Sequence, residues 1–157
     1  MYEFRKLDAL NIACIRTLYL QEECLNMNIA QTRHYEARIR KVYDEMLRRN
    51  SYIYGCFDTK HKKLIAAITV NKCLDCYPGY ADVPYVHLET FIVHKDYHVN
   101  DTVDKGIGTQ LLSEVLKVIR KEGCSYVIIQ SNNEAVIHIA KKVGLTESLN
   151  DMRWKFV

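Results

Sequence analysis

Hydrophobic and polar positions alternate in short runs at both ends of the chain and recur at helical spacing between them, which predicts mixed strands and helices. Met1–Leu7 alternates aromatic and apolar residues with charged ones, as a strand does. A helical pattern follows from Asp8, a candidate N-cap, to about Asn26. A second helix is predicted over Thr32–Arg49, where apolar residues recur every three or four positions. Neither helix carries a pattern that names a catalytic task.

Three extended runs come next. The runs Tyr52–Phe57 and Leu64–Val70 are joined by the polar segment Asp58–Lys63, and this spacing predicts an antiparallel hairpin. A turn-rich excursion over Asn71–Pro84 then leads to a third predicted strand, Tyr85–Val93. The first half of the chain is therefore interpreted as a β-meander with helices.

The second half alternates strands with helices. A helix is predicted from about Thr109 to Glu122, a strand over Tyr126–Gln130 and a helix from about Asn133 to Val143, with a last strand over Met152–Val157. A strand-helix-strand crossover implies locally parallel strands, and ligands bind at the carboxyl ends of such strands. The predicted fold class is α/β (α+β), with a mixed, mostly antiparallel sheet flanked by helices in one domain over residues 1–157.

Composition excludes several classes of protein. The chain has 157 residues, 48% of them hydrophobic, so it can bury a sizeable core. The net charge of +3 is mild, and no basic run typical of nucleic-acid binding occurs. No apolar run approaches the ~20 residues that span a bilayer, and the N-terminus has no signal-peptide pattern. We expect a cytoplasmic protein with no nucleic-acid or membrane partner.

The six cysteines are expected to be free thiols in such a compartment. Cys73 and Cys76 form the only CxxC pair, and no second ligand pair stands at matching spacing, so no metal is expected. A thiol or metal protein that uses Cys73 and Cys76 remains an alternative.

The stretch DKGIGTQLL places Gly106 and Gly108 just before an apolar helix face. The first turn of a helix has backbone N–H groups without intrahelical partners, and glycines let an anion come close to them. Lys105 and the Thr109 hydroxyl would add contacts to such an anion. The alternative is an ordinary tight loop with Thr109 as N-cap. The spacing fits neither a Walker loop nor the dinucleotide fingerprint, which needs a glycine where Leu111 stands.

The segments LETFIVHKDYH…DKGIGTQLL and NNEAVIHIAKKVGL resemble the acetyl-CoA-binding core of the GNAT N-acetyltransferase superfamily. The order of elements also agrees with that family's fold. This resemblance implies an enzyme that transfers an acetyl group from the cosubstrate acetyl-CoA to a primary amine of a small molecule or peptide, by direct attack. It also implies a possible homodimer.

The resemblance also assigns site residues. The family's pyrophosphate loop, its pantetheine-binding strand and the asparagine near the thiol end of the cofactor correspond to Lys105, Gly106, Ile107, Gly108 and Thr109, to Phe91, Ile92 and Val93, and to Asn133.

Glu89 is the first candidate for the general base. It lies four residues before Val93, and a similar strand of spermidine/spermine acetyltransferases carries the proposed base at that place. An amine with a pKa near ~10.4 is mostly protonated at neutral pH, so a carboxylate that takes its proton promotes attack. His87, two residues earlier on the same strand face, is the second candidate.

Two departures from the family pattern stand out. The segment VNDTV, residues 99–103, lengthens the loop before the glycines and puts Val103 where arginine or glutamine is usual, so His98 is interpreted as the displaced counterpart. The family's proton-donating tyrosine corresponds to Ala140, and His138 lies about 200° away on the helix. A general acid is therefore absent, or a tyrosine of the excursion supplies it. The excursion over Cys73–Tyr85 and the first two predicted helices are expected to form the substrate walls, with Tyr77, Tyr80 and Tyr85 lining the acceptor site or, alternatively, packed under a long loop. A non-catalytic acyl-CoA-binding regulatory protein of the same fold is the alternative function.

Overall fold

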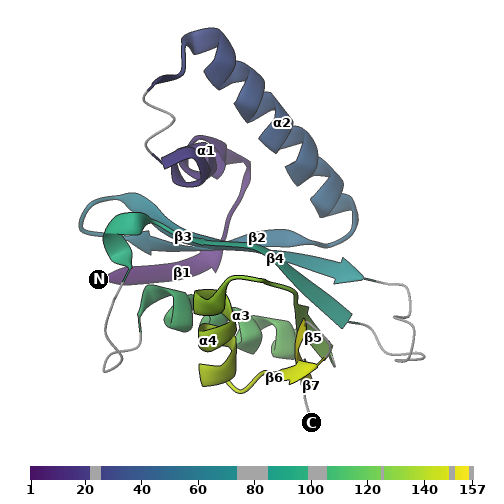
Figure 1. The fold of residues 1–157 in the computed structure, drawn as a ribbon. Coiled ribbons are helices and arrows are strands. Elements are labelled where there is room, and N and C mark those ends of the chain that lie inside the picture. The colour runs from purple at the N-terminus through teal and green to yellow at the C-terminus, as the bar shows by residue number, and fades with distance from the viewer. Residues whose placement is uncertain (22–25, 74–84, 99–105, 125, 149–150, 156–157) are drawn as a thin grey trace.

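The fold is known from a computed structural model that describes residues 1–21, 26–73, 85–98, 106–124, 126–148 and 151–155 (Figure 1). In chain order the elements are β1 (Tyr2–Lys6), η1 (Ala9–Asn11), α1 (Ile12–Leu20), α2 (Ile29–Arg48), β2 (Tyr52–Asp58), β3 (Lys63–Cys73), β4 (Tyr85–Val93), η3 (Lys95–Tyr97), α3 (Ile107–Lys121), β5 (Tyr126–Ile129), α4 (Glu134–Lys142), β6 (Thr146–Ser148) and β7 (Asp151–Lys155).

The strands form one sheet in the order β1-β2-β3-β4-β5-β7-β6. Neighbouring strands are antiparallel except β4 and β5, which run parallel as the crossover between them predicted. Helices α1 and α2 cover one face of the sheet, and α3 and α4 cover the other (Figure 1). The structure therefore confirms a mixed, mostly antiparallel sheet flanked by helices. No helix in the described ranges is both long and apolar enough to cross a membrane.

Several element boundaries differ from the predictions. The first helix was expected to reach about Asn26, but α1 ends at Leu20 because Gln21 takes a positive φ of 46°. The second helix begins three residues earlier than expected, because Asn28 caps it by accepting a hydrogen bond from the Gln31 backbone N–H at 2.8 Å. The short strand β6 was not predicted.

The start of α3 also corrects a prediction. Gly106 is the N-cap, so the helix begins at Ile107 and Thr109 lies inside its first turn. Thr109 is therefore not the N-cap that the tight-loop alternative required. The predicted apolar face of α3 is confirmed, since all of its members are at most 3% exposed: Leu111, Leu112, Val115, Leu116 and Ile119.

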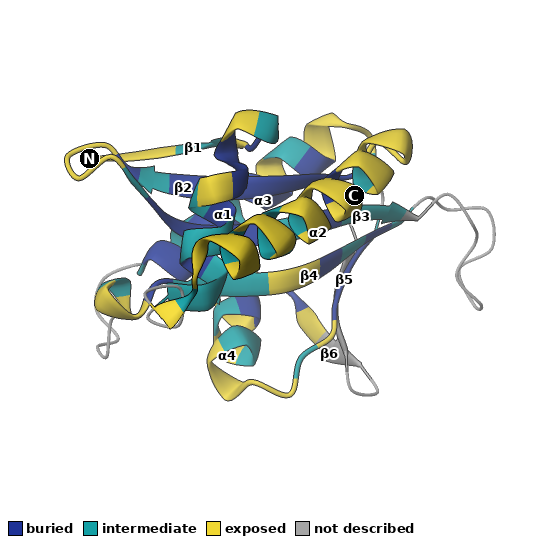
Figure 2. Ribbon diagram, turned by 90° about the horizontal axis from the view of Figure 1, so that it is seen from above, coloured by how far each residue is buried: buried dark blue, intermediate teal, exposed yellow. Residues whose placement is uncertain are grey.

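The two faces of the sheet differ in how tightly their helices pack. The larger core cluster lies between the sheet and α3, where the helix buries a whole side. On the opposite face, α2 buries only Tyr43 fully, and Val42 remains 56% exposed (Figure 2). Helix α2 is thus held at an angle above the sheet, leaving space beneath it.

A β-bulge interrupts β4 at Thr90. Thr69 pairs with Glu89 and Ala67 with Ile92, so two residues of β4 lie opposite the single residue Ile68. Thr90 has a positive φ of 47°, which is rare for a β-branched residue. The pairing of β4 with β5 ends at Leu88, two residues before Thr90. The last part of β4, from Glu89 on, is therefore not paired with β5.

A buried carboxylate ties the β2–β3 hairpin to η3. Asp58 accepts hydrogen bonds from the Tyr97 hydroxyl at 2.7 Å, His61 Nδ1 at 2.6 Å and the Lys60 backbone N–H at 3.0 Å. These hydrogen bonds, those of Tyr97 and His61 above all, hold the pKa of the Asp58 carboxyl well below its usual range. Ionised Asp58 thus fixes Tyr97, which lies next to the loop that precedes α3.

Replacing Asp58 tests this link. A group whose pKa is lowered by folding stabilises the protein above its unfolded pKa of ~3.9, and that contribution is lost as the pH falls below it. We expect Asp58→Asn to lower the Tm by several degrees at pH 7 and by less at pH 3, measured by thermal unfolding. Asp44→Asn, at an exposed site on α2, is the matched control and should leave the Tm unchanged. A pH-independent Asp58→Asn effect would contradict the assignment.

Candidate functional site

Two hollows adjoin β4, one before and one after its bulge. The first, here called the α3 pocket, has a volume of about 520 Å³ and lies between the end of β4, the start of α3 and α4. The second, here called the α2 groove, has a volume of about 440 Å³ and lies between α1, α2 and the sheet. The backbone passes from one to the other between Thr90 and Phe91.

The α3 pocket brings together nine of the residues that the sequence assigned to cofactor binding. They come from four segments that are distant in the chain: Phe91, Ile92, Val93, His98, Gly106, Ile107, Gly108, Thr109 and Asn133. The tenth, Lys105, lies outside the described residues, as does the loop segment of residues 99–103.

The N-terminus of α3 opens into this pocket. Its N-cap Gly106 has no side chain to accept hydrogen bonds from the backbone N–H groups of the first turn. Gly108 packs so closely that a Cβ there would lie 2.9 Å from Ile139 Cδ1 and 3.4 Å from Phe91 Cζ. The two glycines thus leave the positive end of the helix dipole open to an anion.

The charge of the α3 pocket also suits a polyanion. Lys142, His98 and His138 are among its lining residues, and the described lining includes no Asp or Glu. Asp101 and Asp104, which the sequence places near the loop, lie outside the described residues.

Two predicted residues make hydrogen bonds that the sequence did not indicate. Asn133 is the N-cap of α4, and its Oδ1 accepts a hydrogen bond from the Ala135 backbone N–H at 2.9 Å. His98 Nε2 lies 2.8 Å from the carbonyl oxygen of Val93 and donates to it. The imidazole thus occupies an acceptor on the edge of β4, rather than standing free like the arginine it was compared with.

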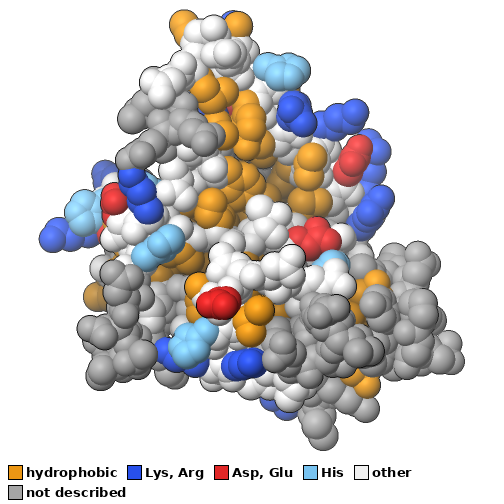
Figure 3. All heavy atoms as spheres, in the orientation of Figure 1, with side chains coloured by type: hydrophobic (Ala, Val, Ile, Leu, Met, Phe, Trp, Pro, Cys, Tyr) orange, Lys and Arg blue, Asp and Glu red, His pale blue; other side chains and the backbone are white. Residues whose placement is uncertain are grey.

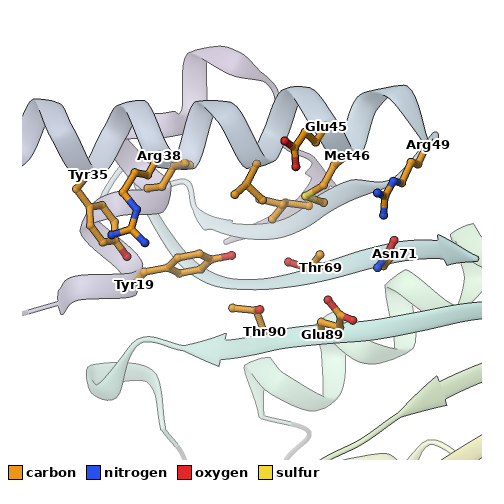
Figure 4. A pocket seen from close by; sticks show the side chains of 13 residues that line it. Tyr19, Tyr35, Arg38, Glu45, Met46, Arg49, Thr69, Asn71, Glu89 and Thr90 are labelled. Carbon is orange, nitrogen blue, oxygen red and sulfur yellow. The ribbon is translucent and has the colours of Figure 1, made fainter.

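The α2 groove has a floor of strand residues and a roof from α2 (Figure 4). Thr69, Asn71, Glu89 and Thr90 project from β3 and β4, while Tyr19 reaches in from the end of α1. The roof is formed by seven residues of one helix face: Tyr35, Arg38, Ile39, Val42, Glu45, Met46 and Arg49.

The two base candidates lie side by side but differ in access. Glu89 lines the groove, and its side chain is 43% exposed. His87 is not among the residues that line the groove; its Nδ1 lies 3.1 Å from Glu89 Oε1. The geometry thus presents the carboxylate to a ligand in the groove and the imidazole to the carboxylate.

Sequence reasoning missed the tyrosines of this groove. Tyr19 and Tyr35 lie in the first two predicted helices, which were expected to form substrate walls without either tyrosine being singled out, while Tyr77, Tyr80 and Tyr85 were expected near the acceptor. Tyr77 and Tyr80 lie outside the described residues, and Tyr85 pairs with Tyr126 at the far end of β4. Burial raises the pKa of the Tyr19 phenol, which also forms a hydrogen bond with Thr69.

The two positions considered for a general acid, Ala140 and His138, lie on α4 and differ in burial. Ala140, at the position of the family's tyrosine, is fully buried. His138 is exposed and lines the α3 pocket. Among the described residues, no group of three or more His, Cys, Asp or Glu could hold a metal ion; Cys76 and the Cys73 side chain lie outside that part of the chain.

Comparison with solved structures shows the same fold in known acetyltransferases. A Trypanosoma brucei acetyltransferase matches with a TM-score of 0.70 and 16% identity over 99% of this chain and 100% of its own. Glucosamine-6-phosphate N-acetyltransferase from Arabidopsis thaliana matches with a TM-score of 0.66 and 14% identity over 95% and 94%. The yncA acetyltransferase structure from Salmonella typhimurium, solved with its cofactor acetyl-CoA, gives 0.67 and 16% over 98% and 93%.

A search of curated protein sequences found no match. The model of the acetyltransferase (GNAT) family, in contrast, matches residues 16–145, which include the second half of α1, both hollows and all of the α3-pocket residues named above. This match agrees with the fold and with the uncapped N-terminus of α3, and it shows that the chain belongs to the GNAT family of acetyltransferases.

Proposed function

We propose that the chain is an N-acetyltransferase that binds acetyl-CoA in the α3 pocket and acetylates a primary amine held in the α2 groove. The observation that carries this proposal is the bulge of β4, where the two hollows meet. One hollow offers backbone N–H groups to an anion, and the other holds a carboxylate, Glu89, one residue before the bulge.

The α3 pocket fits acetyl-CoA as cosubstrate. The diphosphate would accept hydrogen bonds from the first-turn N–H groups of α3, where a side chain at Gly108 would collide with Ile139. The pantetheine amides would bond the backbone of Phe91–Val93 as an added strand, because β5 no longer pairs with β4 there. Pantetheine would then compete with His98 for the Val93 carbonyl.

Transfer by direct attack needs a free amine and a stabilised oxyanion. Glu89 would accept a proton from the acceptor ammonium, directly or through a water molecule. The neutral nitrogen would then attack the thioester carbonyl carbon, while backbone N–H groups beside the bulge stabilise the oxyanion. The nitrogen then loses a second proton to solvent as the carbon–sulfur bond breaks, and CoA leaves as a thiolate, which is acceptable because a thiol pKa is only ~8.5. No cysteine nucleophile is required.

The buried Ala140 favours a second candidate, a non-catalytic acyl-CoA-binding protein of the same fold, because the usual proton donor is missing. Release of CoA in the presence of a panel of primary amines distinguishes the two. Turnover of any amine supports the enzyme, and acetyl-CoA binding without turnover supports the regulatory protein.

Thermal unfolding with acetyl-CoA tests the α3 pocket. A ligand at a hundred times its Kd contributes about 2.7 kcal/mol, or about 5–10 °C in Tm for a domain of this size. Gly108→Asp should abolish the shift, because it adds bulk and negative charge where the diphosphate binds. Gly123→Asp, the same change at the other end of α3, should keep the shift. Lys142→Glu, at an exposed site on the pocket rim, should reduce the shift without affecting folding, and an undiminished shift in both pocket variants would contradict the assignment.

The pH dependence of turnover tests Glu89. We expect Glu89→Gln to lower kcat/KM about a hundredfold at pH 7, where the acceptor amine is mostly protonated. The loss should shrink as the pH rises toward ~10, where the amine needs no base. Glu3→Gln, at an exposed site on β1, is the matched control. Kinetics of Glu89→Gln that equal the wild type at every pH would exclude Glu89 as the base.

A further inference from the structure

We propose that the acceptor is a small zwitterion, an amine that also carries a carboxylate and an apolar side chain, and that Arg49 binds its carboxylate. This inference rests on the proposed acetylation of an amine in the α2 groove. It is carried by the placement of charges and apolar surface on the roof and floor of that groove.

The roof of the groove mixes charged and apolar residues on one helix face. At 100° per residue, the seven roof residues fall within a stripe of about 120°. Ile39, Val42 and Met46 are its apolar members, while Arg38 and Arg49 lie about 20° apart near one edge of the stripe. Both arginines are exposed and line the groove. They therefore place positive charge along its rim.

Three of these charges have no partner among the residues that the structure describes. Across the described residues, Arg38, Glu45 and Arg49 form no ion pair or side-chain hydrogen bond. The groove thus holds two guanidinium groups and two carboxylates, those of Glu45 and Glu89. This balanced set complements a ligand that carries charges of both signs.

The charges are also distributed along the groove. Arg38 and Arg49 are eleven residues apart, or about 16 Å along the helix axis. Arg49, Asn71 and Glu89 lie at one end of the groove, while Tyr19, Tyr35 and Arg38 gather at the other (Figure 4). In the strand register, Glu89 lies opposite Thr69, two residues from Asn71 on β3. An acceptor amine near Glu89 therefore lies closer to Arg49 than to Arg38.

The centre of the groove supplies an apolar surface. Hydrophobic side chains are visible in the hollow between α2 and the sheet (Figure 3), and Val42 is 56% exposed there. A ligand side chain placed along this surface would extend toward the rings of Tyr19 and Tyr35. The volume of about 440 Å³ suits a small molecule. Guanidinium groups bind carboxylates through two parallel hydrogen bonds, so Arg49 is suited to bind the carboxylate of the ligand.

The test compares phenylalanine, leucine and methionine with their amides as acceptors in a CoA-release assay at saturating acetyl-CoA. Each amide keeps the amine and side chain but lacks the carboxylate. We expect kcat/KM to be at least about tenfold higher for the acids, the magnitude of a charge-assisted hydrogen bond. Acids that are no better than their amides, with turnover of the amides intact, would overturn the inference and leave the proposed function standing.

Arg49 variants separate its role from a general effect on the helix. Arg49→Ala should lower kcat/KM for the acids by about tenfold to a hundredfold and leave the amides within twofold. Arg49→Lys should restore part of the preference. Arg48→Ala, at the neighbouring exposed arginine, should change neither. Equal losses for acids and amides in Arg49→Ala would contradict the assignment. Absence of turnover for every amine would refute the proposed function, and this inference with it.

Discussion

The positive φ of Thr90 is the constraint on which the site depends. A β-branched residue in this region costs about 1–3 kcal/mol, and the bulge adds a residue to β4 that β3 does not match. Beyond Leu88, β4 is not paired with β5, and its last residues instead line the pocket beside α3 and α4. Backbone groups on a sheet edge need hydrogen-bond partners, and here a cofactor amide could supply them.

The two faces of the sheet support different tasks because they are packed differently. Helix α3 buries a full side in the larger core cluster, which fixes the position of its first-turn N–H groups. Helix α2 buries little and leaves Val42 exposed over an open groove. A cofactor that does not vary suits a rigid anion site. An acceptor that can vary suits a groove wall, such as α2, that makes few packing contacts with the core. The proposed cofactor site thus lies on the tightly packed face of the sheet, and the proposed acceptor groove lies on the more loosely packed face.

Hydrophobic periodicity predicted α3 and its buried face, the β2–β3 hairpin and the parallel β4–β5 pair, because local patterns determine these elements. It placed the end of the first helix wrongly, because Gln21 ends the helix with a positive φ and is not a glycine, so the sequence does not mark the end. The bulge at Thr90 was not predicted either, because its positive φ also falls on a residue other than glycine. Arg38 and Arg49 passed as ordinary helix residues, because only the tilt of α2 over the sheet shows that they face a hollow. Contacts between distant segments, such as His98 with Val93, have no local signature.

A structure of the protein with acetyl-CoA tests the central claim most directly. The account predicts the diphosphate at the backbone N–H groups of Ile107 to Thr109, the pantetheine along Phe91–Val93 and the thioester at the bulge, facing Glu89 across Thr90. Acetyl-CoA bound in the α2 groove would contradict it. So would acetyl-CoA whose thioester lies away from the bulge and whose pantetheine makes no hydrogen bonds to Phe91–Val93 of β4.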